Sequence, residues 1–577
     1  MTKTRERRKG WLRQAMPGLD VVAAYQKDWF GKDIISGIVL TTLLVPQGMA
    51  YAELAGLPPI TGLYTSILCL LAYAVFGPSR ILVLGPDSAL GPMIAATVLP
   101  LVASDGDPQK AIALASMLAL MVGAIMVLAS VAKLGFIADL ISKPTMIGYM
   151  NGLAITILVG QLPKLFGFKI ESENFIGDLV GFVEGVANGE TVVAAAAVGI
   201  GGIVLILVLQ RWLPKVPAVL VMVVAAIAAT AVFDLAAKGV SLVGELPRGF
   251  PPFTIPQVDF ADLGLMFAGA LGIALVSLTD TISTSTAFAA RTGQEIRGNQ
   301  EMIGIGAANL AAGLFQGFPV STSGSRTAVA ERSGSKTQLT GVTGAVLILL
   351  MLVLLPGLFR NLPQPALAAV VMTASISLAD IPGTVRLWHQ RRTEFYLCMA
   401  AFLGVALLGV LPGIGIAVGL SILNIFRRAW WPYETVIGRV PGYEGFHDIR
   451  VHPDAKHLPG LVIYRWDAPL FFANVRPFRD NVRHLARTEP KPRWIVIAAE
   501  PITDVDTTAA DVLLDLDVEL NAQGISLVFA EVKHRTREKI EKYGLTREIE
   551  PEHFYPTTEA AVAAYMAQTG AQWSAEE

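Results

Sequence analysis

The stretches LGPDSALGP at residues 84–92 and FPVSTSGSR at residues 318–326 decide the fold of this chain of 577 residues. Both interrupt long apolar runs with proline, glycine and hydroxyl residues, and they occupy corresponding places in two halves of the chain. A helix that begins inside a membrane leaves backbone N–H groups unpaired and presents the positive end of its dipole. Two such helix starts that face each other predict an anion site at the membrane midplane, as in inverted-repeat carriers.

Composition places a large part of the chain in lipid. Hydrophobic residues make up 53% and charged residues 16%, with a mean hydropathy of +0.54, whereas soluble proteins average about 25% charged residues. The net charge of -2 does not suggest a nucleic-acid partner. Cys69 and Cys398 lie far apart in apolar runs, so we expect no disulfide framework. All seven histidines lie from His389 onward, so we expect no intramembrane histidine site. No catalytic pair, metal cluster or phosphate loop points to an enzyme.

Hydropathy predicts about 14 membrane-spanning helices, because each needs about 20 apolar residues. The first half, about 33–234, gives seven segments: 33–52, 57–77, 81–101, 111–133, 138–162, 190–211 and 216–234. The second half, about 262–428, gives 262–290, 300–316, 320–332, 338–356, 364–380, 394–409 and 412–427. Since each half has an odd number of crossings, we expect two inverted repeats within a transport domain at 33–428.

Charges outside these segments predict the orientation. Basic residues fall on one side and an acidic loop on the other, although Lys164 and Lys169 lie near that loop: Lys133, Arg211, Lys215, Arg291, Arg297, Lys336, Arg386, Arg391, Arg392, Arg427 and Arg428 against Glu171, Glu173, Asp178, Glu184 and Glu190. The basic segment 1–32 lacks the features of a cleaved signal peptide. The positive-inside rule then predicts a multi-pass protein of the plasma (inner) membrane with both termini in the cytoplasm.

After Trp430 the pattern changes to strands that alternate with amphipathic helices. Strands are predicted at 461–466, 494–497 and 525–529, and helices near 476–487, 508–521 and 533–543. Together they predict one small α/β domain at 435–568, followed by a flexible tail at 569–577.

The second broken stretch carries the strongest candidates for binding an anion. Ser321, Thr322, Ser323 and Ser325 offer hydroxyl groups, Gly324 permits close backbone approach, and Arg326 adds a planar fork of donors. The alternative is that the hydroxyls only cap a helix and that Arg326 pairs with Glu331.

On the first broken stretch, Asp87 is interpreted as a helix cap rather than a ligand. Ser88 and the N–H groups of Ala89 and Leu90 are the binding candidates there. On the first helix, Pro46 predicts a break, and Gln47 and Tyr51 lie one turn apart beside it. For Tyr51, a site role and simple packing both stay open.

Asp280 lies well inside the segment 262–290, where a carboxylate is costly and functional by default. Thr284 is one turn further along the same helix face. The pair suits Na⁺ binding, or Asp280 alone carries a proton; a structural aspartate is the alternative. Glu53 is a second candidate for coupling, with an interfacial position as its alternative.

These residues resemble those of the sulfate permease family, known in animals as solute carrier family 26. The likeness rests on VPQGMAYA at 45–52, PPITGLY at 58–64, GPDSA at 85–89, GNQE at 298–301, and SGSR at 323–326 leading to GSKTQ at 334–338. It implies 14 segments in two inverted repeats, a core domain that moves against a gate domain, and a homodimer. It places the anion site at Gln47, Tyr51, Ser88, Ala89, Ser325 and Arg326.

The likeness also identifies the soluble region as a STAS domain, a candidate docking site for a cytoplasmic protein. In anti-anti-sigma factors a serine in a DSSG turn is phosphorylated; here the turn is DTTA at 506–509, so Thr508 is a regulatory candidate and a helix cap its alternative. Many members carry glutamate where this chain has Asp280. Bicarbonate-transporting cyanobacterial members resemble it in pairing aspartate with a threonine one turn later, which supports Na⁺ coupling.

The leading hypothesis is secondary active transport of a small inorganic anion by alternating access, coupled to H⁺ or Na⁺, with no other cofactor. Sulfate is the first choice, followed by Na⁺-dependent bicarbonate and then a dicarboxylate. A nucleobase–proton symporter shares the fold, and an uncoupled anion channel is a further class.

Overall fold

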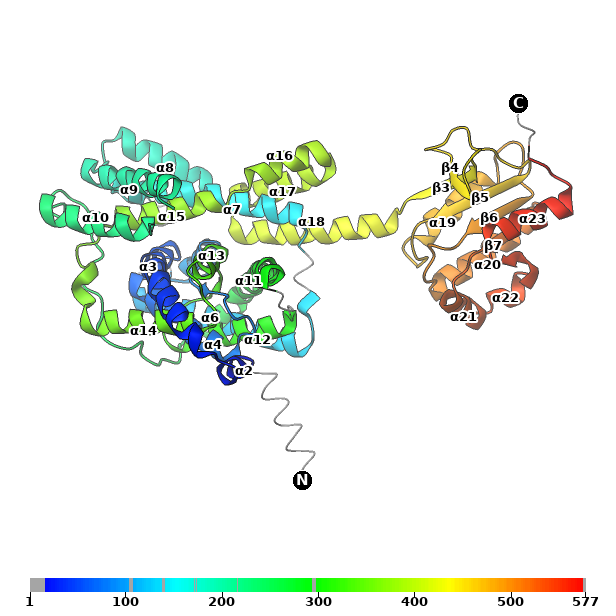
Figure 1. Cartoon of the computed structure of the whole chain (residues 1–577). Coiled ribbons are helices and arrows are strands. Elements are labelled where there is room, and N and C mark those ends of the chain that lie inside the picture. The colour runs from blue at the N-terminus through cyan, green and yellow to red at the C-terminus, as the bar shows by residue number, and fades with distance from the viewer. Residues whose placement is uncertain are drawn as a thin grey trace, which may run out of the picture. The chain divides into compact units, whose positions relative to one another are not determined.

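A computed structural model describes residues 16–102, 107–136, 141–170, 172, 174–214, 216–292 and 297–573. The first 15 residues of the predicted basic leader, the last four of the predicted tail and Lys215 lie outside these ranges. The chain divides into two compact units, Met1–Ile422 and Leu423–Glu577, which Figure 1 shows in one colour gradient.

Helices of the first unit pack into two groups. One group packs around α3, α4 and α12; its members are α2(Gly18–Ala23), α3(Phe30–Leu54), α4(Pro59–Phe76), α5(Gly91–Val102), α6(Pro108–Val131), α11(Phe260–Thr292), α12(Gly298–Leu314), α13(Gly324–Arg332) and α14(Leu339–Leu354). The other packs around α7 and α15; its members are α7(Lys143–Phe166), α8(Phe175–Ala187), α9(Val193–Trp212), α10(Ala218–Phe233), α15(Gln364–Leu378), α16(Ile381–Gln390) and α17(Arg392–Leu408). The helix α18(Val410–Trp430) follows α17 and leads out of this unit.

A helix lies within each of the predicted segments, and eight helical spans of the described chain are long and apolar enough to cross a membrane. The prediction was wrong in detail at four places. The helix predicted at 81–101 begins only at Gly91, and short helices α8 and α16 lie where none was expected. The predicted break at Pro46 is absent, because α3 runs through Pro46 from Phe30 to Leu54. Neighbouring helices allow a membrane helix to lose one backbone bond in this way.

The two broken stretches lie side by side. Their strands β1(Leu84–Gly85) and β2(Ser321–Thr322) pair antiparallel, with Leu84 opposite Thr322. The N–H of Ser323 adds a hydrogen bond to the carbonyl of Val83 at 3.0 Å. Chain segments more than 230 residues apart are therefore joined by backbone bonds, since non-helical backbone inside a membrane must find partners within the protein.

Neighbouring side chains satisfy the rest of this non-helical backbone. Val320 donates its N–H to Asn309 Oδ1 at 3.0 Å, and its carbonyl accepts from Ser277 Oγ at 3.0 Å. The N–H of Phe318 reaches Thr65 Oγ1 at 3.1 Å. Buried polar residues on α4, α11 and α12 thus hold the approach to β2 in place.

The helices α3 and α4 cross in close contact beside these strands. A Cβ built on Gly62 would lie 1.9 Å from the carbonyl oxygen of Gly48. We expect Gly62→Ala to destabilise the protein by about 1–3 kcal/mol, because backbone atoms must separate to admit the methyl group. A lower thermal unfolding temperature in detergent would show it. Gly201→Ala, at a helical glycine with open space around its Cα, is the matched control; equal temperatures for both variants would contradict the packing argument.

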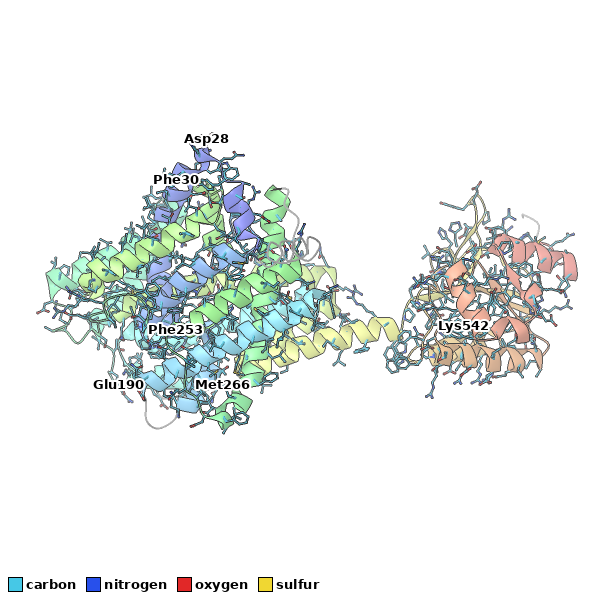
Figure 2. All side chains as sticks on the ribbon, turned by 90° about the horizontal axis from the view of Figure 1, so that it is seen from below. Asp28, Phe30, Glu190, Phe253, Met266 and Lys542 are labelled. Carbon is cyan, nitrogen blue, oxygen red and sulfur yellow. The ribbon has the colours of Figure 1, made fainter. Side chains whose placement is uncertain are left out.

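The outer surface of the first unit is apolar. Phe30 and Phe253 are 56% and 63% exposed, and Figure 2 shows Phe30 at the edge of this unit. Many other large apolar side chains of α9, α10, α14 and α17 are also exposed. Such a surface suits contact with lipid rather than water.

The second unit is a six-stranded sheet in the order β4-β3-β5-β6-β7-β8. Its strands are β3(Glu434–Arg439), β4(Phe446–Asp448), β5(Leu461–Trp466), β6(Trp494–Ala498), β7(Ser526–Ala530) and β8(Phe554–Tyr555). The strands β5 to β8 run parallel. The helices are α19(Val475–Leu485), α20(Thr507–Asn521), α21(His534–Lys542), α22(Leu545–Glu548) and α23(Thr558–Thr569).

The sequence predicted β5, β6, β7, α19, α20 and α21 but missed β3 and the two edge strands β4 and β8, which have only three and two residues. The structured region also extends beyond the predicted end at Gln568. Trp573 packs against Phe446, and the guanidinium of Arg439 lies 5.6 Å from the ring centroid of Trp573. The described part of the expected tail is therefore packed on the sheet.

A buried carboxyl group in α20 makes the stability of this domain depend on pH. Asp517 is 5% exposed, and its Oδ1 has no hydrogen-bond partner among the described residues. Burial raises the pKa of Asp517, with Glu550 nearby adding to the rise and His553 opposing it. Folding therefore retains a proton that the unfolded chain releases, so stability falls as pH rises from the unfolded-state pKa of about 3.9.

We expect Asp517→Asn to stabilise the domain at neutral pH by about 1 kcal/mol, because it removes a charge whose buried oxygen is unpaired. Hydrogen exchange of β6 amides in the full chain, followed by mass spectrometry, measures this change. The gain should shrink as pH falls toward 4. A gain that does not vary with pH would contradict the argument.

Candidate functional site

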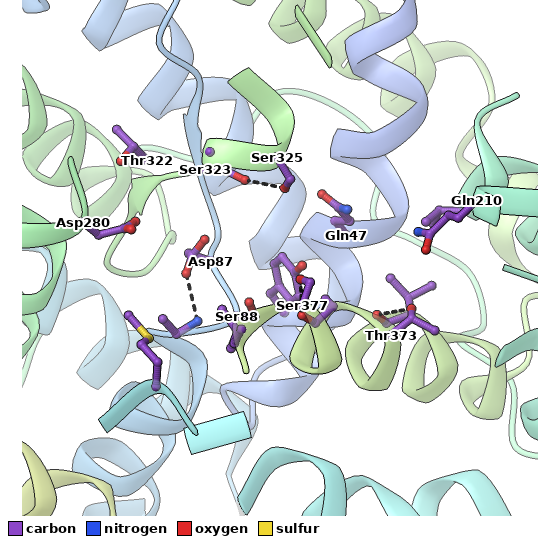
Figure 3. A pocket seen from close by; sticks show the side chains of 18 residues that line it. Gln47, Asp87, Ser88, Gln210, Asp280, Thr322, Ser323, Ser325, Thr373 and Ser377 are labelled. Carbon is purple, nitrogen blue, oxygen red and sulfur yellow. Dashed lines mark hydrogen bonds between the residues drawn. The ribbon is translucent and has the colours of Figure 1, made fainter. Parts of the chain in front are cut away.

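A cavity of about 390 Å³ lies where the paired strands meet the second helix group. Figure 3 shows the polar side chains around it. One wall comes from α3, the segment 87–89, α11 and the start of α13; the other comes from α7, α9, α10 and α15. The cavity is therefore enclosed between the two helix groups, so a movement of one group against the other would change its access.

The first wall contains most of the residues that the sequence predicted. Those that line the cavity are Gln47, Tyr51, Asp87, Ser88, Ala89, Asp280, Thr322, Ser323, Gly324 and Ser325. Gln47 and Tyr51 lie one turn apart on α3 and both reach the cavity, although α3 is unbroken. Leu90 and Arg326 are buried at 0% and 1% exposure and are not on the wall.

The start of α13 supplies the donors that best suit an anion. Ser323 caps the helix: its Oγ accepts the N–H of Arg326 at 3.4 Å and lies 3.1 Å from Ser325 Oγ. The N–H of Thr327 makes the first bond of the helical ladder, to the carbonyl of Ser323. Among the groups described there, the N–H groups of Gly324 and Ser325 remain at the positive end of the helix dipole. Both residues are exposed to the cavity.

The first broken stretch contributes differently. Asp87 Oδ1 accepts the N–H of Ala89 at 2.8 Å, and the Asp87 carbonyl accepts the N–H of Gly91 at 3.2 Å. Asp87 thus acts as the cap that the sequence predicts. The N–H of Ala89 is used in this cap, which leaves the Ser88 hydroxyl as the main donor from this stretch.

Arg326 lies behind the cavity wall rather than on it. Its Nη2 donates to the carbonyl of Pro86 at 2.5 Å, while Nε and Nη1 have no partner among the described groups. A Cβ on Gly85 would lie 2.5 Å from Nη1, so any side chain at position 85 would displace the guanidinium. The guanidinium is thus a fixed positive charge beside Asp87, and the alternative pairing with Glu331 finds no support in these contacts.

Asp280 lines the cavity from α11 and accepts a hydrogen bond from Ser321 Oγ at 3.2 Å. Thr284, one turn later, is 9% exposed and does not line the cavity. Its Oγ1 would lie 3.8 Å from a Cβ on Gly324, which places it beside the start of α13. The described chain holds no cluster of three or more His, Cys, Asp or Glu side chains that would bind a metal tightly. Asp280 and Thr284 could hold Na⁺ only with carbonyl or water oxygens.

Glu53 does not lie in this cavity. It lines a second one of about 690 Å³, together with Lys164, Asp178 and residues along α5. Lys164 Nζ donates to the carbonyl of Glu53 at 3.3 Å. Both cavities are bordered by α3 and α7. The first is also bordered by the segment just before α5 and the second by α5 itself, so the two cavities follow one another along the same helices.

The second helix group adds polar residues that sequence reasoning missed. Gln210 of α9 and Thr373 and Ser377 of α15 line the cavity opposite the half-helices (Figure 3). The hydroxyls of Thr373 and Ser377 donate to carbonyls of their own helix, so Gln210 is the freer donor. A polar residue near the end of an apolar helix was the available signal for Gln210.

Thr508 lies in the second unit, exposed in the first turn of α20. Asp506 caps this helix, since its Oδ1 accepts the N–H of Ala509 at 2.8 Å. The cap is therefore Asp506 and not Thr508, which leaves the Thr508 hydroxyl accessible.

Comparisons with known proteins agree with these observations. The model of the sulfate permease family matches residues 30–401, and that of the STAS domain matches residues 452–561. A probable sulfate transporter of Mycobacterium tuberculosis is 41% identical over 559 residues, which cover 96% of this chain and 98% of that protein. The chloroplastic sulfate transporter 4.1 of Arabidopsis thaliana is 30% identical over 96% of this chain and 82% of its own length.

Solved structures share the fold. The murine solute carrier 26 family member A9 anion transporter, in its inward-facing state, superposes with a TM-score of 0.89 at 21% identity, covering 97% of this chain and 95% of that one. The transmembrane domain of a cyanobacterial bicarbonate transporter gives 0.59 at 21% identity, covering 68% and 99%.

Proposed function

The chain belongs to the sulfate permease family and is a multi-pass membrane transporter of anions, and on that premise we propose that it takes up sulfate by alternating access, driven by H⁺ or Na⁺. The observation that carries the proposal is the cavity between the two helix groups, where hydroxyls and the start of α13 offer hydrogen bonds to an oxyanion. Sulfate is preferred because relatives in bacteria and plants are named sulfate transporters.

Two features of the geometry support alternating access. The cavity separates the two helix groups, so each group contributes one wall. The second cavity continues along α3, α5 and α7, beyond Tyr51, and Lys164 bonds across it to α3. An outward path for the anion would require this contact to open. In transporters built from repeats, movement of one bundle against the other around a central site produces this exchange.

Asp280 is the proposed coupling residue. It is a carboxylate inside a membrane helix, it faces the cavity, and Ser321 of the anion-binding stretch donates to it. A proton or Na⁺ at Asp280 would lower the negative charge next to the anion, so the two would bind together. Thr284 is a candidate further ligand only for Na⁺.

The remaining proposals concern the cellular context. We place the protein in the plasma membrane as a homodimer with cytoplasmic termini, following the charge pattern of the loops. The STAS domain is the proposed contact for a cytoplasmic protein, and the accessible Thr508 hydroxyl is its candidate regulatory site.

Uptake into proteoliposomes tests the function. Labelled sulfate, bicarbonate and succinate are offered with a pH gradient and a Na⁺ gradient imposed separately. The proposal predicts that sulfate accumulates above its external concentration under one of these gradients. Accumulation of bicarbonate alone would replace the proposed anion, and flux that never exceeds equilibrium would indicate a channel.

A further inference from the structure

The charged groups of the cavity do not balance. Among the described residues that line it, Asp87 and Asp280 are the only charged ones. The nearest buried cation is Arg326, behind the wall. Two carboxylates beside one guanidinium leave an excess of one negative charge, in a site proposed to receive an anion.

The N-termini of two helices together offset about one negative charge of the cavity. An α-helix presents roughly half a positive charge at its N-terminus, and α5 and α13 both begin beside the cavity. The empty site is therefore close to neutral when both carboxylates are ionised. A sulfate dianion then brings about two uncompensated negative charges into a region shielded from water, which is strongly unfavourable unless cations enter with it.

Asp87 has a free oxygen for such a cation. Its Oδ1 is used by the N–H of Ala89, whereas none of the described groups donates a hydrogen bond to Oδ2. Figure 3 shows the Asp87 carboxylate between Asp280 and the Ser323–Ser325 pair, facing the cavity. The other titratable groups that face it are Asp280 on α11 and Tyr51 on α3, with Arg326 behind it.

We propose that Asp87 is a second acceptor of the coupling cation, so that sulfate is carried with two cations and without net charge. This inference rests on the proposed function and assigns its stoichiometry. Asp280 accepts one H⁺ or Na⁺ and Asp87 accepts the other, while Asp87 still caps α5 through Oδ1. A monovalent anion at the same site needs one cation fewer.

The proposal is tested by how steeply the equilibrium accumulation of sulfate depends on the cation gradient. With the membrane potential clamped at zero by K⁺ and valinomycin, two cations per sulfate give an equilibrium accumulation that is the square of the cation gradient. A tenfold gradient then yields about 100-fold accumulation for the wild type and about tenfold for Asp87→Asn. Uptake by wild type should not respond to potential, whereas uptake by Asp87→Asn should be accelerated when the interior is positive.

Two variants control for folding and for charge. Asp87→Ser retains a helix cap without a carboxylate and should behave as Asp87→Asn, while Asp87→Glu retains the charge and should restore the squared dependence. A first-power dependence in the wild type, or the same exponent in wild type and both neutral variants, would overturn the role of Asp87 while leaving sulfate transport in place. Failure of the wild type to accumulate sulfate would instead overturn the proposed function, and this inference with it.

Discussion

Replacing Arg326 by alanine should nearly abolish sulfate binding and uptake. Arg326 is 1% exposed and provides the buried positive charge next to Asp87 and the cavity. Its removal leaves two carboxylates facing the anion with only the helix dipoles to offset them. Removing one partner from a buried charge group costs about 3–5 kcal/mol, and a cost of that size in binding corresponds to a loss of affinity of about 10²- to 4 × 10³-fold.

Calorimetric titration of the purified protein with sulfate measures this loss directly, and proteoliposome uptake measures its effect on transport. Arg332→Ala is the matched control, because Arg332 lies on the exposed last turn of the same helix, away from the cavity. Arg326→Lys retains the charge but not the fork of donors, so it should recover part of the affinity. Unchanged sulfate affinity in Arg326→Ala would contradict the electrostatic role.

Neutralising Asp280 should have the second largest effect. It should lower the inside-to-outside ratio that sulfate reaches at steady state rather than the rate at which sulfate crosses the membrane. In Asp280→Asn the site loses one of its two proposed cation acceptors, although Ser321 can still bond to the amide oxygen. Because Asp87 can still accept one cation, we expect sulfate accumulation to fall from the square of the imposed cation gradient to its first power, about tenfold instead of about 100-fold under a tenfold gradient at zero membrane potential.

The matched control is Asp262→Asn, which removes a carboxylate from the first turn of the same helix, outside the cavity. It should accumulate sulfate as the wild type does. The ratio is measured at steady state with labelled sulfate, and initial rates are measured in parallel. Accumulation that survives Asp280→Asn at the wild-type level would place the coupling site elsewhere.

Local sequence predicted the main elements well where hydropathy or composition changes sharply. Long apolar runs predicted helices, and the proline–glycine interruptions at 84–92 and 318–326 predicted the half-helices α5 and α13. The two helix starts were also expected to face each other, as in inverted-repeat carriers. The pairing of Leu84 with Thr322 brings the two stretches together, but the backbone bonds themselves were not predicted.

The geometry of individual side chains was harder to predict, because it depends on contacts between distant segments. Arg326 was expected on the cavity wall but lies behind it. Its guanidinium donates to the carbonyl of Pro86 and occupies the space that Gly85, without a side chain, leaves open. Glu53 lies near Tyr51 in sequence but faces a different cavity, since two residues along a helix turn a side chain by more than half a revolution. Gln210 and the α15 residues were missed because apolar helices give no local sign of which face will meet the other group.

The most direct test of the account is to locate a bound anion in the protein. Selenate is an isostere of sulfate, and its anomalous scattering identifies it in a crystal of the full chain. The account predicts selenate in the cavity, within hydrogen-bond distance of Ser88 and of Ser325 at the start of α13. Selenate bound only outside this cavity, with the space between the paired stretches unoccupied at saturating concentration, would contradict it.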